Sequence, residues 1–577
     1  MSSAKHMGSP DGFSPALDSG GSASSVAEPL AGSGRVPSRL AWDRKDRAIA
    51  GVVFALMLVA IAAALLVPIE TLGYLTNDDA YYYFQPALNI VQGEGVTFDG
   101  MNPTNGFHPL WMLISTGLAH AAGADHVLLL RLVYVVLCLL LGGSMILCWA
   151  YTRSIAGPIG AGAAILCFAH PLVLQMMLNG LESALLVFLI FLLLWSGRKY
   201  GLVDTDATTV KKALLGALLA ATFLARLDSA FIVLGIAVAV CLRDRVRVWS
   251  LRSVVRLLRS YAPAFGVFVL AVLPYFAWNV SANGHLAPIS GGLKSSFPRL
   301  AGNWRAVHSM LWLPYTGLIA VTLVLGVTLL LSRGTRRRLL PGGMAVTSSG
   351  GTLLAGIWCG LVLHFAYTAC FTTWGVKYWT FASHIPVAMV LVALCCGIVA
   401  DRVERKRVVA AVAFAIILGG SSASHAFVWM EKGNVHAFWH DAAAWVRENT
   451  SEDAVFGMTD CGYFGYFSRR TTINLDGLIN GYEYQEALAD GRLREYFRKC
   501  GLDYVVDYEV KDDGRTEHGI RLAYGRQPGA RRRYTLFILP TADAIYASPA
   551  YQQERVTSPH KPPVRFMIWP YDPNHVP

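Results

Sequence analysis

Two adjacent carboxylates carry the clearest chemical signal in this sequence. Asp78 and Asp79 stand in the run Thr76-Asn-Asp-Asp-Ala80, directly after the first long apolar segment. No Lys or Arg occurs from Ala48 to Leu130, so no basic residue of the same loop neutralises the pair. Two like charges this close spread or raise their pKa values. Such a pair suits a general base, or a metal site if an ion neutralises it.

A helix cap explains the same residues without any catalysis. Asn77 or Asp78 can accept backbone N–H bonds at a helix start, and Asp79 is favourable to the helix dipole there. Both interpretations stay open when these residues are taken alone.

The composition indicates a membrane protein. The chain has 577 residues, of which 54% are hydrophobic and 15% are charged, whereas a soluble chain carries about 25% charge. A membrane span needs about 20 apolar residues. Eleven segments qualify, some only as broken pairs: 48–69, 128–150, 158–178, 183–196, 211–225, 230–242, 262–280, 308–331, 352–370, 379–399 and 408–427.

The basic residues predict the orientation of these spans. Residues 428–577 hold 18 Lys and Arg against 20 Asp and Glu, a net charge of −2, so the first 427 residues carry 31 − 18 = +13, against +11 for the whole chain. Within them, 22 basic residues fall on alternate loops, which marks those loops as cytoplasmic. The opposite loops hold six: Arg131, Arg226, Lys294, Arg299, Arg305 and Lys377. The charge therefore marks topology, not nucleic-acid binding, and predicts a cytoplasmic N-terminus and an outer C-terminus.

Three regions follow from this layout. Residues 1–40 have too few large apolar side chains to fold and are expected to form a disordered cytoplasmic tail. Residues 41–427 form the membrane domain, with an outer loop at 70–127 in which the short apolar segment 109–122 is re-entrant or interfacial. Residues 428–577 are expected to form an extracytoplasmic α/β domain. Its helices are expected at 439–447 and 488–497 and its strands at 454–458 and 504–508; Cys461 and Cys500 can pair there or stay free.

Several short motifs resemble one family of membrane enzymes. The outer loop contains Asp78-Asp-Ala-Tyr-Tyr-Tyr83, Gly93-x-Gly-x-Thr-Phe-Asp-Gly100 and Thr104-Asn-Gly-Phe-His-Pro-Leu-Trp111. Later segments are Asn179-Gly-Leu-Glu-Ser183, Ala225-Arg-Leu-Asp-Ser229, Pro288-Ile-Ser-Gly-Gly-Leu-Lys-Ser295 and Asn474-Leu-Asp-Gly-Leu-Ile-Asn480. In this order they resemble bacterial GT-C membrane glycosyltransferases, a superfamily that includes protein O-mannosyltransferases, aminoarabinose transferases and arabinofuranosyltransferases.

The resemblance implies an inverting transferase that moves one sugar from a polyprenyl-phosphate carrier to an acceptor hydroxyl. It favours Asp78 as the base over Asp79, which would orient the acceptor. Glu182 would enter the same cavity, unless it only stabilises the start of the helix at 183–196.

The leaving phosphate requires cations near the outer interface. Lys294 is favoured because flexible glycines flank it, and the other candidates are Arg226, His108, Arg131 and Lys377. Simpler roles compete: Arg226 can pair with Asp228, Arg131 and Lys377 can reach lipid headgroups, and His108 can be a loop histidine.

Four further residues are expected to contact the sugar or the acceptor: Tyr82, Asn105, Asp228 and Asp476. An interfacial aromatic belt explains Tyr82 without any ligand, and structural turns explain Asp476 and its neighbour Asp460. No cofactor is expected, because lipid-phosphate donors of this class resemble metal-independent cases, although a divalent cation stays open.

The expected partners are the lipid-linked sugar, a glycan, glycolipid or protein acceptor, and membrane lipid. The protein is expected to be a monomer in a bacterial inner membrane. A secondary transporter or lipid flippase is the alternative function, but transporters usually place ionisable groups near the midplane of repeated halves.

Overall fold

The computed structural model describes residues 42–246, 250–303, 348–402, 415–426 without 417 and 425, 436–512, 515–516, 550–555 and 564–571. The predicted tail 1–40, the predicted span 308–331 and part of the predicted span 408–427 lie outside these residues.

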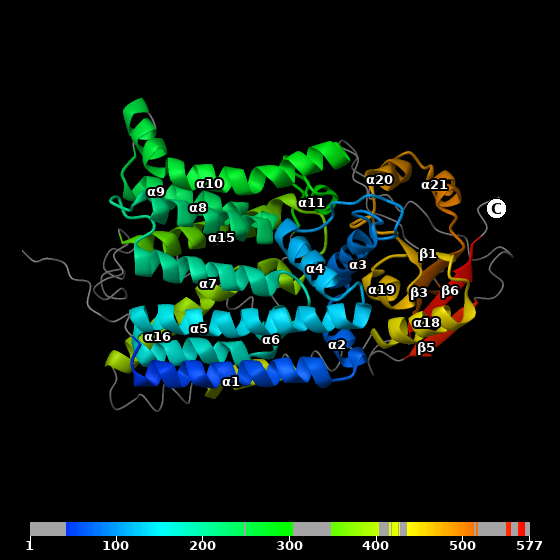
Figure 1. Ribbon diagram of the computed structural model, residues 1–577, viewed down its shortest axis with the longest axis horizontal. Helices are drawn as coiled ribbons and strands as arrows, with labels where there is room; N and C mark the ends of the chain where they lie inside the picture. The colour runs from blue at the N-terminus through cyan, green and yellow to red at the C-terminus, as the bar shows by residue number, and fades with distance from the viewer. Residues whose placement is uncertain are drawn as a thin grey trace, which may run out of the picture. The chain divides into compact units, whose positions relative to one another are not determined.

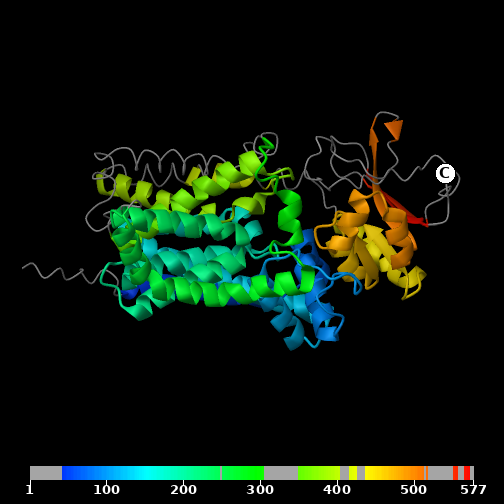
Figure 2. The same cartoon turned by 90° about the horizontal axis from the view of Figure 1, so that it is seen from above.

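A set of helices that run side by side forms the first part of the described chain (Figures 1 and 2). Its α-helices are α1 (Arg44–Leu66), α2 (Ile69–Leu75), α3 (Tyr81–Gln92), α4 (Pro109–Ala121), α5 (His126–Leu166), α6 (Pro171–Met177), α7 (Ser183–Tyr200), α8 (Thr209–Ala225), α9 (Ala230–Arg243), α10 (Leu251–Asn283), α11 (Ile289–Lys294), α15 (Ser349–Phe371) and α16 (His384–Arg402). Short 3-10 turns are η1 (Asp78–Ala80), η2 (Cys167–Ala169), η3 (Leu227–Ser229) and η4 (Tyr378–Phe381).

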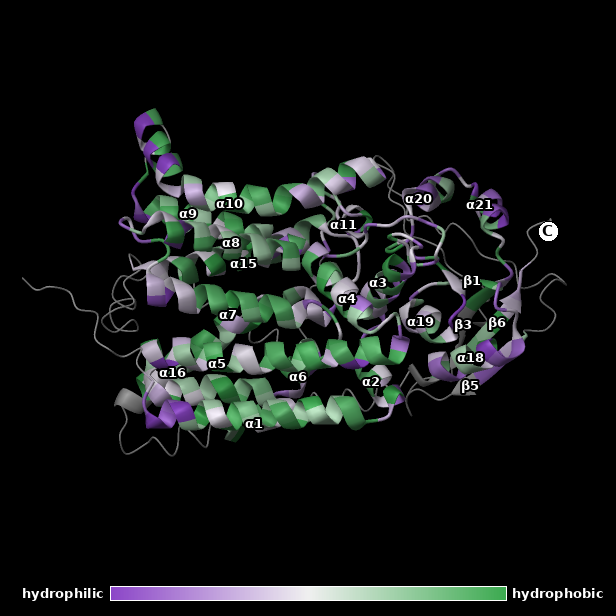
Figure 3. Ribbon diagram, viewed as in Figure 1, coloured by the Kyte–Doolittle hydropathy of each residue, from purple (hydrophilic) through white to green (hydrophobic). Residues whose placement is uncertain are grey.

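Five of the described helices are long and apolar enough to cross a membrane: α1, α5, α7, α10 and α15. Hydrophobic residues cover most of their length in Figure 3. The helices α8 and α9 are shorter, and α16 offers a shorter apolar helix at His384–Val399. A polytopic helical fold agrees with the sequence prediction, whereas the predicted number of eleven spans stays a prediction.

The predicted break between the spans 128–150 and 158–178 is confirmed. The element α5 consists of two helices joined at Gly157, whose φ of 72° and ψ of 178° are not helical and which glycine adopts at little cost. The chain turns back there, because Ile146 before the break and Ile165 after it both lie beside Ile49 and Val53 of α1. The rest of the second predicted span forms η2 and α6.

Glycines bring α9 and α15 into backbone contact. A Cβ at Gly235 would lie 2.2 Å from the Gly356 carbonyl oxygen, and one at Gly360 would lie 2.3 Å from the Phe231 carbonyl oxygen. Small residues four apart allow this approach between membrane helices, where packing replaces the hydrophobic effect as the driving force.

The C-terminal part is a mixed sheet with helices. Its elements are α18 (His436–Asn449), β1 (Val455–Met458), α19 (Gly462–Ser468), β2 (Thr471–Asn474), α20 (Tyr482–Ala489), α21 (Leu493–Cys500), β3 (Tyr504–Asp512), β4 (Arg515–Thr516), β5 (Tyr551–Arg555) and β6 (Val564–Pro570). The strand order is β2-β1-β3-β6-β5, with β4 paired to β3. β1 is parallel to β2 and β3, whereas β6 is antiparallel to β3 and β5.

One detail of the C-terminal part differs from the sequence analysis, and one alternative that it left open is decided. The helix expected at 488–497 is two helices, α20 and α21, because Gly491 breaks the run with a left-handed φ of 72°. Cys461 and Cys500 are free thiols, and Cys461 is buried. The strands expected at 454–458 and 504–508 are confirmed as β1 and the first half of β3.

We expect Gly360→Ala to destabilise the protein, because its methyl group would press on the backbone of α9. Overpacking of this kind costs about 1–3 kcal/mol. The thermal unfolding midpoint of the purified protein in detergent measures the effect. Gly266→Ala in α10 is the matched control: no atom lies within 4 Å of the position that its methyl group would take, so its midpoint should stay level or rise. Equal midpoints for the two variants would contradict the packing argument.

Candidate active site

The Asp78 carboxylate joins the first loop to the C-terminal part. One oxygen accepts a hydrogen bond from the backbone N–H of Tyr463 at 2.7 Å, and the other accepts one from Gly462 at 3.1 Å. Asp78 therefore caps α19, a helix that lies almost four hundred residues further along the chain. Gly462 permits this approach, because a Cβ there would lie 2.2 Å from the Asp78 carbonyl oxygen.

Burial governs the protonation of Asp78. The residue is 7% exposed, and this desolvation raises its pKa well above the usual value, helped by the negative charge of Asp460 and opposed by the two amide hydrogen bonds. The carboxyl is thus a dry structural group with both oxygens already engaged.

Asp79 is in a different position. Its backbone N–H donates to the Asn77 side chain at 3.0 Å, so Asn77 caps η1 as the helix-cap interpretation predicts. Among the described residues, its carboxylate has no hydrogen bond or ion pair. The resemblance favoured Asp78 as the base. In the structure both Asp78 oxygens accept backbone N–H bonds, whereas the Asp79 carboxylate has no hydrogen-bond partner among the described residues, so the choice of base stays a proposal.

Charges of both signs act on Asp79. Burial raises its pKa, the positive charges of Lys294 and Lys377 lower it, and the negative charges of Asp460 and Glu182 raise it further. The net direction is upward. A carboxylate with a raised pKa is a stronger base when ionised, which suits proton abstraction near neutral pH.

A third carboxylate approaches from the C-terminal part. Oxygens of Asp78, Asp79 and Asp460 lie within 4.8 Å of one another. Oxygen donors at this spacing are compatible with a divalent cation such as Mg²⁺ or Mn²⁺, but Asp78 already accepts two N–H bonds. Asp460 holds a left-handed φ of 44°, and its backbone N–H donates to Asp476 at 3.1 Å.

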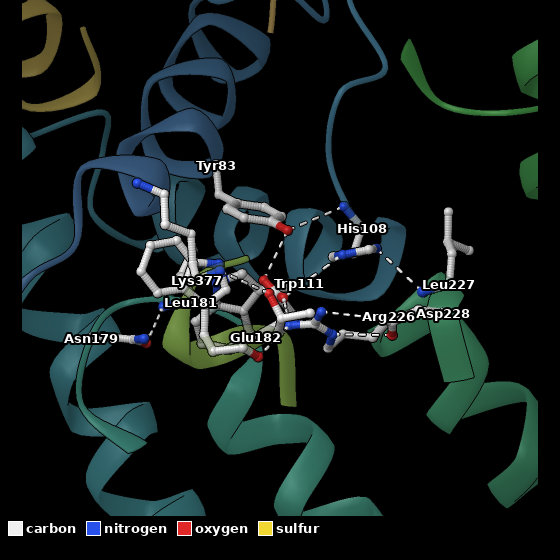
Figure 4. Close-up of polar contacts among 12 residues, drawn as sticks. Tyr83, His108, Trp111, Asn179, Leu181, Glu182, Arg226, Leu227, Asp228 and Lys377 are labelled. Atoms are coloured by element: carbon white, nitrogen blue, oxygen red, sulfur yellow. Dashed lines mark hydrogen bonds and ion pairs between the residues drawn. The ribbon is translucent and has the colours of Figure 1, made fainter. Parts of the chain in front are cut away.

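Glu182 is the centre of a second, buried network (Figure 4). One oxygen accepts the Tyr83 hydroxyl at 2.9 Å, and the other accepts Arg226 at 3.1 Å. Tyr83 in turn accepts the backbone N–H of His108 at 3.2 Å. Glu182 is 3% exposed, so the network ties α3, the first loop and the starts of α7 and η3 together in a dry environment.

Arg226 is committed to this network. Besides Glu182, it makes a two-point pair with Asp228 at 2.7 and 3.2 Å and donates to the Trp379 carbonyl at 3.1 Å. Burial opposes ionisation of Asp228, but the Arg226 guanidinium outweighs it and lowers the Asp228 pKa. This pair is the alternative that the sequence analysis offered for Arg226, and the predicted phosphate role of Arg226 and sugar role of Asp228 stay predictions.

His108 closes the network on its loop side. Its Nδ1 accepts the backbone N–H of Leu227 at 3.3 Å, so we assign the proton of the neutral ring to Nε2. Nε2 lies 3.7 Å from Glu182. Burial lowers the His108 pKa, against the opposing charge of Glu182, so the ring is a neutral donor rather than a fixed cation.

Four more predicted site residues lie at the C-terminal part or on the loops around α11 and η4. Tyr82 meets the C-terminal part, where its hydroxyl lies 3.4 Å from Asp476 and 3.1 Å from the Asn474 amide. Burial raises the pKa of Asp476 to about 6, and the Asp460 charge adds to the shift. Lys294 ends α11 and is half-buried, and Lys377 precedes η4 and is exposed.

Two residues with predicted ligand contacts make hydrogen bonds within the protein. Arg131 donates to the carbonyls of Ala64 and Leu65 at 2.9 and 2.7 Å and to Val67 at 3.1 Å, so it caps the end of α1. Asn105 is fully buried and bonds the Asn279 amide and the Ile289 N–H, which holds α10 and α11 to the first loop. These donors and acceptors are used within the protein.

Sequence reasoning missed the groups that hold these residues in place. They are Tyr83, Gly462, Tyr463, Asn279 and His364, which lies 3.5 Å from Asp228. Each meets its partner through the fold and not through a local pattern; the one available signal was Tyr83 within the tyrosine run beside Asp78.

The chain matches one known protein family and several solved structures. A family described as Domain of unknown function (DUF8728) matches residues 429–555. Among the curated proteins, none matches.

Solved structures give the second match. The chain is similar to the archaeal oligosaccharyltransferase AglB from Archaeoglobus fulgidus, in complex with an inhibitory peptide and a dolichol-phosphate, at 13% identity and a TM-score of 0.48 over 80% of this chain and 70% of AglB. It is also similar to ArnT from Cupriavidus metallidurans bound to undecaprenyl phosphate, at 13% identity and a TM-score of 0.45 over 80% of this chain and 93% of ArnT.

We expect Gly462→Ala to loosen the C-terminal part from the first loop, because the methyl group cannot fit against the Asp78 backbone. A loss of about 1–3 kcal/mol in unfolding free energy follows from such overpacking. Limited proteolysis of the purified chain, with release of the C-terminal fragment as the readout, measures the loosening. Gly117→Ala in α4 is the control, since the space around it is open; release at the same rate from both variants would show that the Asp78 joint does not hold the two parts together.

Proposed function

We propose that this chain is a membrane glycosyltransferase that moves a single sugar from a polyprenyl-phosphate donor to an acceptor hydroxyl, with Asp79 as the general base. The observation that carries the proposal is the Asp79 carboxylate. It has no hydrogen bond among the described residues, while the charges of Lys294 and Lys377 act on it. Transfer from a phosphate requires a free base near cations, and neither lysine forms an ion pair within the described part of the chain.

The base step uses Asp79. Its carboxylate takes the proton of the acceptor hydroxyl as that oxygen attacks the anomeric carbon of the sugar. The bond from this carbon to the phosphate oxygen breaks, and its electron pair stays on the lipid phosphate. Attack opposite to the leaving group inverts the configuration. Asp78 acts as a positioning residue, because its bonds to Gly462 and Tyr463 fix η1.

The leaving group is assigned to the two lysines. Negative charge grows on the phosphate oxygens as the bond breaks, and a nearby ammonium group stabilises it. Arg226 and Arg131 are engaged by protein partners, so Lys294 and Lys377 are the cations left for this role, with the His108 Nε2–H as a neutral donor.

The buried network is assigned a positioning role. Glu182 is held by Tyr83 and Arg226, and its charge reaches Asp79. Glu182 therefore supplies a rigidly held negative charge near Asp79 while Asp79 carries the proton. We assign Asp460, Asp476 and Tyr82, which meet at the C-terminal part, to the side where the acceptor would enter.

The setting follows from the motifs and the charge pattern. We assign the reaction to the outer face of a bacterial inner membrane and the acceptor to a cell-envelope glycan or glycolipid, with the chain acting as a monomer. A divalent cation held by Asp78, Asp79 and Asp460 would neutralise the two adjacent aspartates and help bind the phosphate. Proton abstraction by Asp79 and stabilisation of the phosphate by the lysines do not depend on such a cation.

Asp79→Asn should abolish transfer with the fold intact, because the amide cannot accept the proton. A general base contributes about 10²–10⁴-fold to the rate. The assay measures labelled sugar passed from a polyprenyl-phosphate donor to acceptor membranes by the reconstituted protein. Asp125→Asn is the control: Asp125 caps α5 in the same loop, and asparagine caps equally well. A wild-type rate in the Asp79 variant would remove the base, and movement of the donor across the membrane without covalent transfer by the wild type would indicate a flippase.

Lys294→Ala and Lys377→Ala should each weaken donor binding, because each removes a cation from the phosphate. Charge-assisted contacts contribute about 1.5–3 kcal/mol, so affinity should fall roughly tenfold or more per variant. Equilibrium binding of the donor to protein in detergent measures this. The control is Arg299→Ala, an exposed basic residue on the loop after Lys294; affinities unchanged in both lysine variants would exclude them as phosphate ligands.

A further inference from the structure

The helix α10 is longer than a membrane crossing requires. Its 33 residues rise about 50 Å at 1.5 Å per residue, whereas a span uses about 20 residues. Pro263 interrupts its hydrogen-bond ladder near the start. The residues before it, 251–261, are here called the α10 arm, and in Figure 1 this end of the helix turns away from its neighbours.

The α10 arm has three distinct faces. Arg252, Arg256 and Arg259 recur at helical spacing, so they share one face, and all three are exposed. Leu251 and Leu258, seven residues apart, are 77% and 63% exposed on another. Figure 3 shows the resulting alternation of hydrophilic and hydrophobic residues along the arm.

The third face packs on the protein. Leu257 and Tyr261 contact the hydrophobic core. Lys212 of α8 donates to the Ser260 hydroxyl at 2.5 Å and lies 4.7 Å from the Tyr261 ring. The arm is therefore anchored at the end next to Pro263, which leaves the arginine face and the leucine face outward.

The three arginines of the arm form no ion pair within the described part of the chain; the nearest acidic residue in the sequence, Asp244, pairs with Arg243. No Asp or Glu occurs between Asp244 and Asp401. Three unpaired guanidinium groups on one face repel each other and favour a polyanionic surface.

The arm lies at the far end of α10 from the candidate active site. The other end of α10 leads to α11 and Lys294, whose charge acts on Asp79. A helix that crosses the membrane once places its two ends on opposite sides, so the arm meets the leaflet opposite Asp79.

We propose that the α10 arm binds the phosphate groups of anionic phospholipids in the leaflet opposite Asp79. The arginines contact the headgroups, and Leu251 and Leu258 enter the boundary of the acyl chains. A basic face beside exposed leucines on a helix at the membrane surface is the arrangement that binds anionic lipid.

Tryptic cleavage of the full chain in nanodiscs tests the location of the arm. Cleavage after Arg252, Arg256 and Arg259 should be about tenfold slower in discs of phosphatidylcholine with phosphatidylglycerol than in discs of phosphatidylcholine alone, and high salt should remove the difference. Cleavage after Arg44, Lys45 and Arg47 is the internal control, because Asp43 and Asp46 flank these exposed residues. Equal rates at the arm in the two lipids would overturn the proposal.

Retention of lipid tests the arginines themselves. The triple variant Arg252→Gln, Arg256→Gln, Arg259→Gln should lose most of the phosphatidylglycerol that copurifies with the wild type, measured by mass spectrometry of the extracted lipid. The variant Arg44→Gln, Lys45→Gln, Arg47→Gln removes the same charge and should retain it. A matching size-exclusion profile shows that each variant is folded. Retention by both variants, or equal loss from both, would show that the arm is not the lipid site.

Discussion

The capping of α19 by Asp78 is the contact on which the candidate site depends. Two oxygens of one carboxylate accept two successive backbone N–H groups from a helix 385 residues away along the chain. Charge-assisted bonds in a dry contact are stronger than those at a surface, and the missing side chain at Gly462 lets the two backbones meet. The same joint brings Asp460 to Asp79 and the Asn474 amide to Tyr82.

Adjacency in the sequence explains why the two aspartates differ. In the tight turn of η1, successive side chains leave the helix about 120° apart, so only Asp78 meets the start of α19, where both of its oxygens form the cap. Asp79 still lies close to Asp460 of the C-terminal part, and the charges of Lys294, Lys377 and Glu182 also act on it. Burial raises the pKa of both groups, but an unpaired, half-buried carboxylate can still exchange a proton, whereas the capped one would first have to leave its amide partners.

Much of the fold could be predicted because long apolar segments and alternating strands are local patterns. The lengths of α1 and α15, the cap at Asn77 and the strands β1 and β3 followed from neighbouring residues. The break within α5 also followed from a local pattern, because Gly157 and Pro158 stand side by side there. The roles of the site residues divide between local and distant contacts. The pairing of Arg226 with Asp228 was a local alternative, while the bonds of Asp78 to α19 and of Asn105 to Asn279 join distant segments.

The few cations on this side of the membrane are used in two chemically different ways. Both arginines with resolved partners serve the fold: Arg131 caps α1, and the planar fork of Arg226 fits Asp228 at two points and is rigidly held. Lysine carries its charge on a flexible stem with a compact ammonium group. The phosphate gains charge and moves away as its bond to the sugar breaks. A mobile ammonium group can stay in contact with it, whereas a guanidinium group fixed in a buried pair cannot. This division, with the arginines in structural contacts and the lysines without ion pairs among the described residues, fits the site that we propose for a departing lipid phosphate.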